Sequence, residues 1–328
     1  MLYLTKKDIK RIFSLKEAIV AARQAFAIYS AGKCLAPLRT NIAAPKFQGQ
    51  TLYMPSYLEE QNIGGVKIIS IFPANRNKGL PTTHAVMVLV DKKTGQIASV
   101  LDGTYLTQLR TGAAQGLATE LLARKDSKVG VLFGTGGQAA TQLEAMLTVR
   151  RLKQVYIFAR NKKRTAEFAA RMQTALSSYN AELIANADLS WALSVADVIT
   201  AVTTANEPVF DGRLVKKGTH VNGVGSYTPK MQELDEYILT RADKVFVDSK
   251  KAVMAEAGDF IKPLAAGVID PNQIGELGEL ALGKIPGRRS DEEITLFKTV
   301  GIAVQDLVTA GAIYKKAVEE GVGTKIEL

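Results

Sequence analysis

The sequence predicts an α/β fold built on a doubly wound parallel sheet, joined to a smaller α+β domain. Two observations carry this prediction. From residue 129 onward, short apolar runs alternate with helical segments, which is typical of parallel strands connected by helices. Before that point, β-prone runs follow one another with only turns between them, which indicates an α+β domain. The chain has 328 residues, enough for two domains of ordinary size.

The first domain opens with a helix and continues as strands. Ser14-Leu-Lys-Glu17 is a capping box, and the apolar positions from Leu15 to Tyr29 repeat at helical spacing until Gly32. Asp91-Lys-Lys-Thr-Gly95 has the composition of a hairpin turn. The expected strands are 51–58, 66–72, 84–90 and 96–101, followed by a helix over 107–123 and a polar connector over 124–127.

The second domain opens on the most informative segment of the chain. The run Val129–Phe133 suits a buried parallel strand, and it breaks directly into a glycine-rich turn. Gly134 permits a tight bend, Gly136 lets backbone N–H groups approach a pyrophosphate, and Ala139 lets the next helix pack on the strand. The N-terminus of that helix then faces the phosphates. This pattern predicts a dinucleotide-binding turn made of Gly134, Thr135, Gly136, Gly137 and Gln138.

A second strand, 155–158, ends where a nucleotide-binding fold places its ribose-reading residue. An acidic residue there would accept hydrogen bonds from the ribose hydroxyls of NAD, but the segment is basic. Arg160, helped by Asn161, Lys162 or Arg164, offers the charge and donors that suit a 2′-phosphate. We therefore predict NADPH as cofactor, with NADH as the alternative. The competing interpretation is a solvated basic helix start, which the helix dipole disfavours unless an anion is present.

The remaining segments complete the two domains. Further strands are expected at 181–184, 198–202, 220–224 and 245–247. A long helix is expected from Ile294 to about Ala317, apolar on more than one side, and we expect it to return to the first domain and help form a dimer. The predicted domains are 1–122 with 301–328, which binds substrate and dimerises, and 123–300, which binds NADP.

Composition excludes several classes of protein. A hydrophobic content of 47% and a charged content of 23% are ordinary for a globular protein, and no apolar stretch approaches the roughly 18 residues that span a membrane. Charged residues interrupt the N-terminus, so no signal peptide is expected. A single cysteine, Cys34, excludes an internal disulfide and agrees with the cytoplasm. One cysteine and two histidines make a structural metal site unexpected.

The formal net charge of +10 raises the question of nucleic acid. The basic residues are dispersed along helices and turns, and aromatic residues do not interleave with a basic stripe. We therefore predict no nucleic-acid partner. The positive field instead suits anionic ligands, such as a dinucleotide phosphate and a small carboxylate.

Three cations in apolar surroundings are candidates for binding that carboxylate. Lys67 lies within a β-prone run, Arg110 lies early in a helix of small and apolar residues, and Arg39 lies in a loop. Together they could fix a carboxylate, although each alone could equally pair with an internal acid such as Asp102. His84 is a candidate proton donor, or simply a packed histidine. His220, inside an expected central strand, is interpreted as a core residue.

The sequence resembles the ornithine cyclodeaminase/mu-crystallin family over nearly its full length. That family also contains ketimine reductases, pyrroline-2-carboxylate reductases and certain alanine dehydrogenases. The motifs that carry the resemblance are Leu52-Tyr-Met-Pro55, Gly65-Val-Lys67, Gly79-Leu-Pro-Thr82, Leu101-Asp-Gly103, Leu109-Arg-Thr-Gly-Ala-Ala114, Gly134-Thr-Gly-Gly-Gln138, Asn222-Gly-Val-Gly225, Val247-Asp-Ser249 and Glu256-Ala-Gly-Asp259.

The resemblance implies a homodimer, with substrate held between a dimerisation domain built from both chain ends and a Rossmann domain. It implies that Arg39, Lys67 and Arg110 bind the substrate carboxylate. Lys67 and His84 are the candidate catalytic residues, and Thr82 and Tyr227 complete the substrate site. The resemblance also implies cofactor contacts from Thr111, Gly134 to Gln138, Arg160, Asn161, Lys162, Thr203, Thr204 and Val224.

Two departures from the family pattern bear on the reaction. Ornithine cyclodeaminases continue Asn222-x-x-Gly225 with an aspartate that handles the amine, and Tyr227 occupies its place here. Leu52 stands where another acid is expected. We therefore predict NADPH-dependent reduction of Δ1-pyrroline-2-carboxylate to proline, of Δ1-piperideine-2-carboxylate to pipecolate, or of both. The alternatives are deamination of ornithine or alanine, and a non-catalytic protein of the mu-crystallin type that binds NADPH and a carboxylate ligand.

Overall fold

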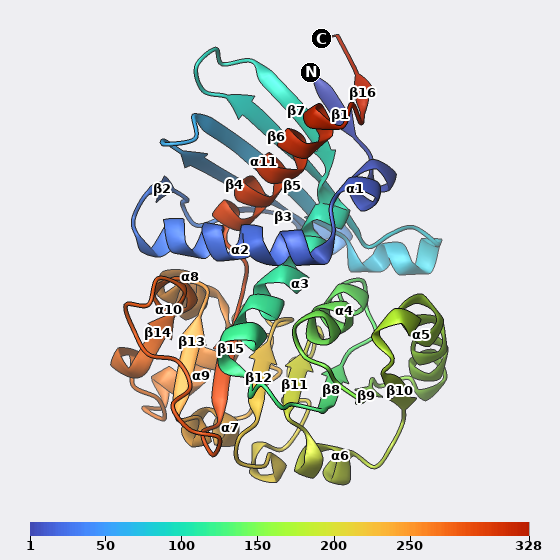
Figure 1. Cartoon of the computed structure of the whole chain (residues 1–328), viewed down its shortest axis with the longest axis vertical. Helices are drawn as coiled ribbons and strands as arrows, with labels where there is room; N and C mark the ends of the chain where they lie inside the picture. Colours follow the sequence, from blue (N-terminus) through green and yellow to red (C-terminus); the bar gives the residue numbers. More distant parts are fainter. Residues whose placement is uncertain (328) are drawn as a thin grey trace. The chain divides into compact units, whose positions relative to one another are not determined.

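The computed structural model describes residues 1–327, which form two compact units (Figure 1). Unit 1 comprises Met1–Arg110 and the residues from Gly301 onward, and unit 2 comprises Thr111–Val300. The first boundary lies inside helix α3 (Gly103–Leu122), whereas the predicted boundary is the end of that helix. Both ends of the chain therefore belong to one unit, and unit 2 is continuous in sequence.

Unit 1 contains a mixed eight-stranded sheet. Its strand order is β16-β1-β7-β6-β5-β4-β2, and β3 also pairs with β4. The four longest strands match the predicted ones, and the short strands were not predicted. The strands are β1 (Leu2–Leu4), β2 (Cys34–Leu35), β3 (Thr40–Ala44), β4 (Gly49–Leu58), β5 (Ile63–Ile71), β6 (Thr83–Asp91), β7 (Ile97–Asp102) and β16 (Thr324–Lys325).

Three helices belong entirely to unit 1: α1 (Lys6–Ile12), α2 (Leu15–Ser30) and α11 (Ala303–Glu319). The predicted capping box begins α2, where the Ser14 side chain accepts a hydrogen bond from the backbone N–H of Glu17. Helix α11 lies across β4, β5 and β6 and also contacts α2 (Figure 1). Because α11 packs on a sheet and on a helix, its apolar residues occupy more than one side.

Unit 2 contains an eight-stranded parallel sheet of the doubly wound type, as predicted. The chain forms β8, β9 and β10 outward in one direction and then returns to place β11 on the other side of β8. The order is β10-β9-β8-β11-β12-β15-β13-β14. The strands are β8 (Val129–Phe133), β9 (Gln154–Phe158), β10 (Glu182–Ala185), β11 (Val198–Ala201), β12 (His220–Gly223), β13 (Lys244–Val247), β14 (Ile274–Glu276) and β15 (Thr295–Lys298).

Helices connect most of these strands. After α3 they are α4 (Ala139–Val149), α5 (Lys162–Ala175), α6 (Leu189–Val195), α7 (Glu236–Arg241), α8 (Lys250–Glu256), α9 (Gly258–Ala265) and α10 (Leu277–Ala281). No helix in the described part of the chain is long and apolar enough to cross a membrane.

The helix predicted from Ile294 is wrong over its first residues. Thr295–Lys298 is strand β15, which lies between β12 and β13 in the sheet, and α11 begins only at Ala303. The apolar run has no periodicity of its own, so it merges with the helical pattern that follows. Gly301, at φ +81°, separates the strand from the helix.

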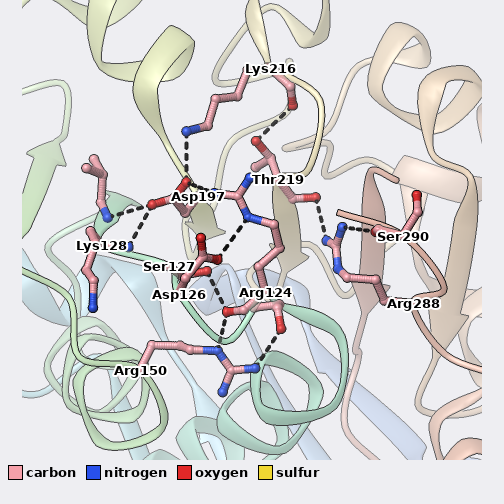
Figure 2. Close-up of polar contacts among 12 residues, drawn as sticks. Arg124, Asp126, Ser127, Lys128, Arg150, Asp197, Lys216, Thr219, Arg288 and Ser290 are labelled. Carbon is pink, nitrogen blue, oxygen red and sulfur yellow. Dashed lines mark hydrogen bonds and ion pairs between the residues drawn. The ribbon is translucent and has the colours of Figure 1, made fainter. Parts of the chain in front are cut away.

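A polar network occupies the edge of this sheet where the strands begin (Figure 2). The Asp197 carboxylate accepts hydrogen bonds from the backbone of Lys128 at 2.7 Å and Val129 at 3.0 Å, and it forms ion pairs with Arg124 and Lys216. Arg150 donates to the carbonyls of Glu120, Ala123, Arg124 and Val149, which satisfies the ends of α3 and α4. Several basic residues thus have a structural role at this edge, and the glycine-rich turn after β8 lies at the opposite one.

Candidate active site

The glycine-rich turn lies at the carboxyl end of β8, where the winding of the sheet reverses. Gly134 adopts φ +108°, and its N–H donates to the Phe158 carbonyl at the end of β9. A Cβ on Gly134 would overlap the Val202 carbonyl, which follows β11. The turn is therefore packed against both neighbours of β8. In doubly wound folds this reversal point is where ligands bind.

Gly136 has no neighbour within the protein that requires a glycine. Its φ is ordinary, and a Cβ added to it would meet nothing within 4 Å. The turn is partly exposed, and the side chain of Gln138 makes no capping hydrogen bond to α4. The Ala139 N–H donates to the Gly136 carbonyl at 3.1 Å, but no side chain caps the first turn of α4, and Gly136 leaves space for an anion to approach it. These features fit a dinucleotide pyrophosphate.

The basic segment lies at the end of β9, as predicted. Asn161 caps α5 by accepting a hydrogen bond from the Arg164 backbone N–H at 3.0 Å. The first turn of α5 contains no acidic residue, and Arg160 to Arg164 are all exposed. Positive charge at a helix N-terminus is unfavourable unless an anion compensates it, so this segment also suits a phosphate.

The other residues predicted to contact cofactor lie in unit 2 as well. Thr203 and Thr204 follow β11, and Val224 follows β12, so all three lie at carboxyl ends of strands. Thr203 is half-buried and Thr204 is exposed. Thr111 is buried in α3, beside Gly112, where a Cβ would overlap the Thr141 backbone of α4.

Unit 1 brings together the three cations that the sequence singled out. The Lys67 Nζ lies 2.7 Å from the Asp306 Oδ2, and the Arg110 Nε lies 3.0 Å from the Asp306 Oδ1. Arg39 donates to the Gly301 carbonyl at 2.6 Å. The short segment from Gly301 to Asp306 therefore holds all three side chains.

Two further contacts fix this arrangement. Gln305 Oε1 accepts hydrogen bonds from Arg110 and from the Ile302 backbone, both at 3.1 Å. A Cβ on Gly301 would overlap the Arg110 guanidinium, so the close approach requires a glycine.

The cluster has more positive than negative charge. Lys67 and Asp306 are 0% exposed and Arg110 is 6% exposed, so water compensates little of this charge. Burial, and after it the charge of Arg110, lower the pKa of Lys67 to about 7, although Asp306 opposes the shift. A second carboxylate would be stabilised here by the same cations. We take this cluster as the candidate substrate-carboxylate site.

The internal acid that pairs with these cations is Asp306, not Asp102. Asp102 instead accepts a hydrogen bond from the Tyr105 backbone at 2.7 Å, at the start of α3. Asp306 was missed because a carboxylate in a helical pattern resembles a surface residue. The apolar residues around it, Val304, Leu307 and Val308, were the available signal.

The structure does not bring His84 to this cluster. Across β5 and β6, Lys67 pairs with Met87 and Ser70 pairs with His84, so the alternation of side chains places Lys67 and His84 on opposite faces. His84 is also exposed. Thr82 is half-buried in the turn before β6.

His220 is a core residue, as interpreted from the sequence. It is 0% exposed, and its ring nitrogens lie 2.9 Å from Thr295 Oγ1 and 3.0 Å from Asn222 Oδ1. Burial lowers the pKa of His220 to about 3, so the ring is neutral. Tyr227 is half-buried in the turn after β12, and Leu52 is buried in the core beside Met54.

Comparisons with known proteins agree over the full length of the chain. The family model described as ornithine cyclodeaminase/mu-crystallin family matches residues 1–321. A Δ1-pyrroline-2-carboxylate reductase of Bacillus cereus is 39% identical, covering 100% of both chains. The structure of Thermococcus litoralis Δ1-pyrroline-2-carboxylate reductase with NADH and L-proline has a TM-score of 0.94 and 42% identity, covering 99% of this chain and 100% of that one. An archaeal alanine dehydrogenase dimer with bound NAD has a TM-score of 0.91 and 34% identity, covering 100% and 99%.

The fold, the dinucleotide turn and these relatives define the class of protein: an oxidoreductase that uses a nicotinamide dinucleotide. Within that class, the chain belongs to the ornithine cyclodeaminase/mu-crystallin family.

Proposed function

We propose that this enzyme reduces cyclic imino acids, converting Δ1-pyrroline-2-carboxylate to proline and, as its six-membered homologue, Δ1-piperideine-2-carboxylate to pipecolate. The observation that carries the proposal is the gathering of Arg39, Lys67 and Arg110 on the segment 301–306. Its excess of positive charge suits a substrate with one carboxylate. A solved relative that contains NADH and L-proline supports the same substrate class.

In this proposal Arg39 and Arg110 hold the substrate carboxylate by charge-assisted hydrogen bonds, which fixes the orientation of the adjacent imine carbon. When bound, the reduced dinucleotide supplies the hydride that this carbon accepts. The imine nitrogen must carry a proton, and we assign Lys67 as its source rather than His84. Burial lowers the pKa of Lys67 to about 7, which suits proton transfer near neutral pH.

The test is oxidation of NADPH and NADH, followed at 340 nm, with three substrates: Δ1-pyrroline-2-carboxylate, Δ1-piperideine-2-carboxylate, and pyruvate plus ammonia. We expect rapid turnover of a cyclic imine and no ammonia release from ornithine. Turnover of pyruvate plus ammonia alone would favour alanine dehydrogenation, which the alanine dehydrogenase relative supports as the second candidate. The absence of cofactor oxidation with every substrate would favour a non-catalytic binding protein.

The carboxylate site should lose affinity as pH rises. Because the pKa of Lys67 is about 7, its ammonium is present below that pH and is lost above it. A ring carboxylate that does not titrate near neutrality, such as pyrrole-2-carboxylate, should therefore inhibit competitively with a Ki that rises above pH 7. Its inhibition constants between pH 6 and 9 check this, and a Ki independent of pH over that range would contradict it.

We propose NADPH as the preferred cofactor because Arg160 and its basic neighbours are exposed at the end of β9. Replacing Arg160 with aspartate is expected to raise the Kd of NADPH about 10- to 100-fold, since it removes a charged partner of the 2′-phosphate and adds a like charge. The Kd of NADH should change far less. Fluorescence titration of both cofactors checks this, and equal losses would remove the 2′-phosphate proposal.

We also propose that the enzyme is a homodimer. On the face of the unit 1 sheet opposite to Lys67, apolar residues such as Ile68, Val86 and Val88 are only half-buried. The alanine dehydrogenase relative is a dimer, which supports the proposal. Light scattering coupled to size-exclusion chromatography should give twice the chain mass of 35.4 kDa. Replacing Ile68 with aspartate should shift the protein to the monomer mass.

A further inference from the structure

Glu233 is a fully buried carboxylate that joins two turns at the carboxyl edge of the unit 2 sheet. Its Oε1 accepts a hydrogen bond from the backbone N–H of Thr203, in the turn after β11. Its Oε2 accepts hydrogen bonds from Gly225 at 2.6 Å and Ser226 at 2.9 Å, in the turn after β12. A single side chain therefore satisfies three backbone donors from two different connections.

The backbone at Glu233 is fixed by the carboxylate of a buried ion pair. Asp259 Oδ1 accepts hydrogen bonds from the backbone of Glu233 at 2.6 Å and Leu234 at 3.0 Å. Its other oxygen lies 2.7 Å from the Nζ of Lys298, at the end of β15. Glu233, Asp259 and Lys298 are each 0% exposed. Because every link is buried, Glu233 has no alternative position in which it could be hydrated.

The two turns also touch each other directly. A Cβ on Gly225 would overlap the backbone of Thr203 and approach the Glu233 carboxylate. Burial raises the pKa of Glu233, whereas the charge of Lys298 and the backbone N–H groups of Thr203 and Ser226 lower it. Three backbone donors directed at the two oxygens of Glu233 favour an ionised carboxylate, and an amide in its place would offer only one acceptor oxygen.

These turns lie where the proposed function requires the nicotinamide half of the cofactor. Strand β11 pairs with β8, whose own turn is the dinucleotide turn, and β12 is the next strand along. Thr203 and Val224 are among the residues for which the family resemblance implies contact with the cofactor. Glu233 does not reach the surface, so it can act only through the turns that it holds.

We propose that Glu233 is a positioning residue for the nicotinamide half of the cofactor: it holds the turns after β11 and β12 together. This proposal rests on the proposed function. The adenosine half depends on other residues, namely Gly134 to Gln138 and Arg160. The side chain of Glu233 is hydrogen-bonded to Thr203, Gly225 and Ser226 instead.

The test compares two ligands that share the adenosine half. In the Glu233→Gln variant, the Kd of NADH, from fluorescence titration without substrate, is expected to rise about 10- to 100-fold, because at least one turn N–H is left opposite an amide donor. The Kd of ADP-ribose, which lacks nicotinamide, should stay within about twofold by calorimetry. Glu236→Gln makes the same chemical change three residues away on an exposed side chain and should alter neither value.

Hydrogen exchange gives a second readout that does not depend on cofactor. Amide exchange in the segments containing Thr203 and Gly225–Ser226 should accelerate in Glu233→Gln and remain slow in Glu236→Gln. If Glu233→Gln does not fold, Glu233→Asp, which keeps the charge but shortens the side chain, should show the same selective loss at smaller size.

Equal losses of NADH and ADP-ribose, or an unchanged Kd for NADH, would overturn the positioning role. Wild-type protein that binds none of NADPH, NADH and ADP-ribose would instead remove the proposed function itself. The two failures are therefore distinguishable.

Discussion

Replacing Asp306 with asparagine is expected to lower the free energy of unfolding by about 3–5 kcal/mol, because it leaves Lys67 and Arg110 buried without their shared counter-charge. The side chains of Lys67 and Arg110 are only 1% and 7% exposed, so water cannot replace the lost carboxylate. Urea denaturation at pH 7 measures the difference. Asp126→Asn is the matched control, since that side chain is 77% exposed, and it should change stability by less than about 0.5 kcal/mol.

A double variant separates charge from packing. If the loss arises from an uncompensated ammonium, adding Lys67→Met to Asp306→Asn should recover part of the stability, because the remaining carboxamide then faces one cation instead of two. Purely additive losses in the double variant would show that packing, not charge, dominates at this position.

Replacing Arg39 with methionine is expected to raise the KM of the imino acid about 10- to 150-fold, the cost of one charge-assisted hydrogen bond to the substrate carboxylate. Arg39 is half-buried, in contrast to Lys67, so the substitution should disturb folding least among the three cations. The KM of Arg39→Lys should lie between those of the wild type and Arg39→Met, because lysine keeps the charge but lacks the paired donors of the guanidinium.

The Kd of NADH provides the control for Arg39→Met. The proposed cofactor residues all belong to unit 2, whereas Arg39 belongs to unit 1, so cofactor affinity should change by less than about twofold. An unchanged KM for the imino acid would argue against Arg39 as a carboxylate ligand.

Much of the fold follows from local sequence signals. The strand 129–133 with its glycine turn, the strand at 155–158 and the capped helix α2 were predicted because each depends on a short contiguous pattern. The short strands β1, β2, β3 and β16 were not predicted. They are two to five residues long and form only because a longer neighbour offers backbone partners. Strand β15 was hidden for a related reason: its burial on both faces removes the alternation that identifies a strand.

Of the residues in the candidate site, only the positively charged ones were predicted. Lys67, Arg39 and Arg110 were recognised because a cation in an apolar sequence demands an explanation. The same reasoning applies to Asp306, Glu233 and Asp259, but carboxylates inside helices and turns have common local uses as caps. Lys67 and Asp306 are 239 positions apart in the sequence, and no local pattern specifies a pairing over such a separation.

The discontinuity of unit 1 has a consequence for biosynthesis. Unit 2 is contiguous from Thr111 to Val300, so all of its strands have been synthesised before any residue of α11. Domains fold as units during synthesis, and unit 2 is therefore able to fold while the nascent sheet of unit 1 still lacks the helix that covers β4 to β6. During that interval Lys67 has no carboxylate partner from Asp306. The sheet of unit 1, although its long strands are synthesised first, thus stays without its covering helix until the last segment of the chain is available.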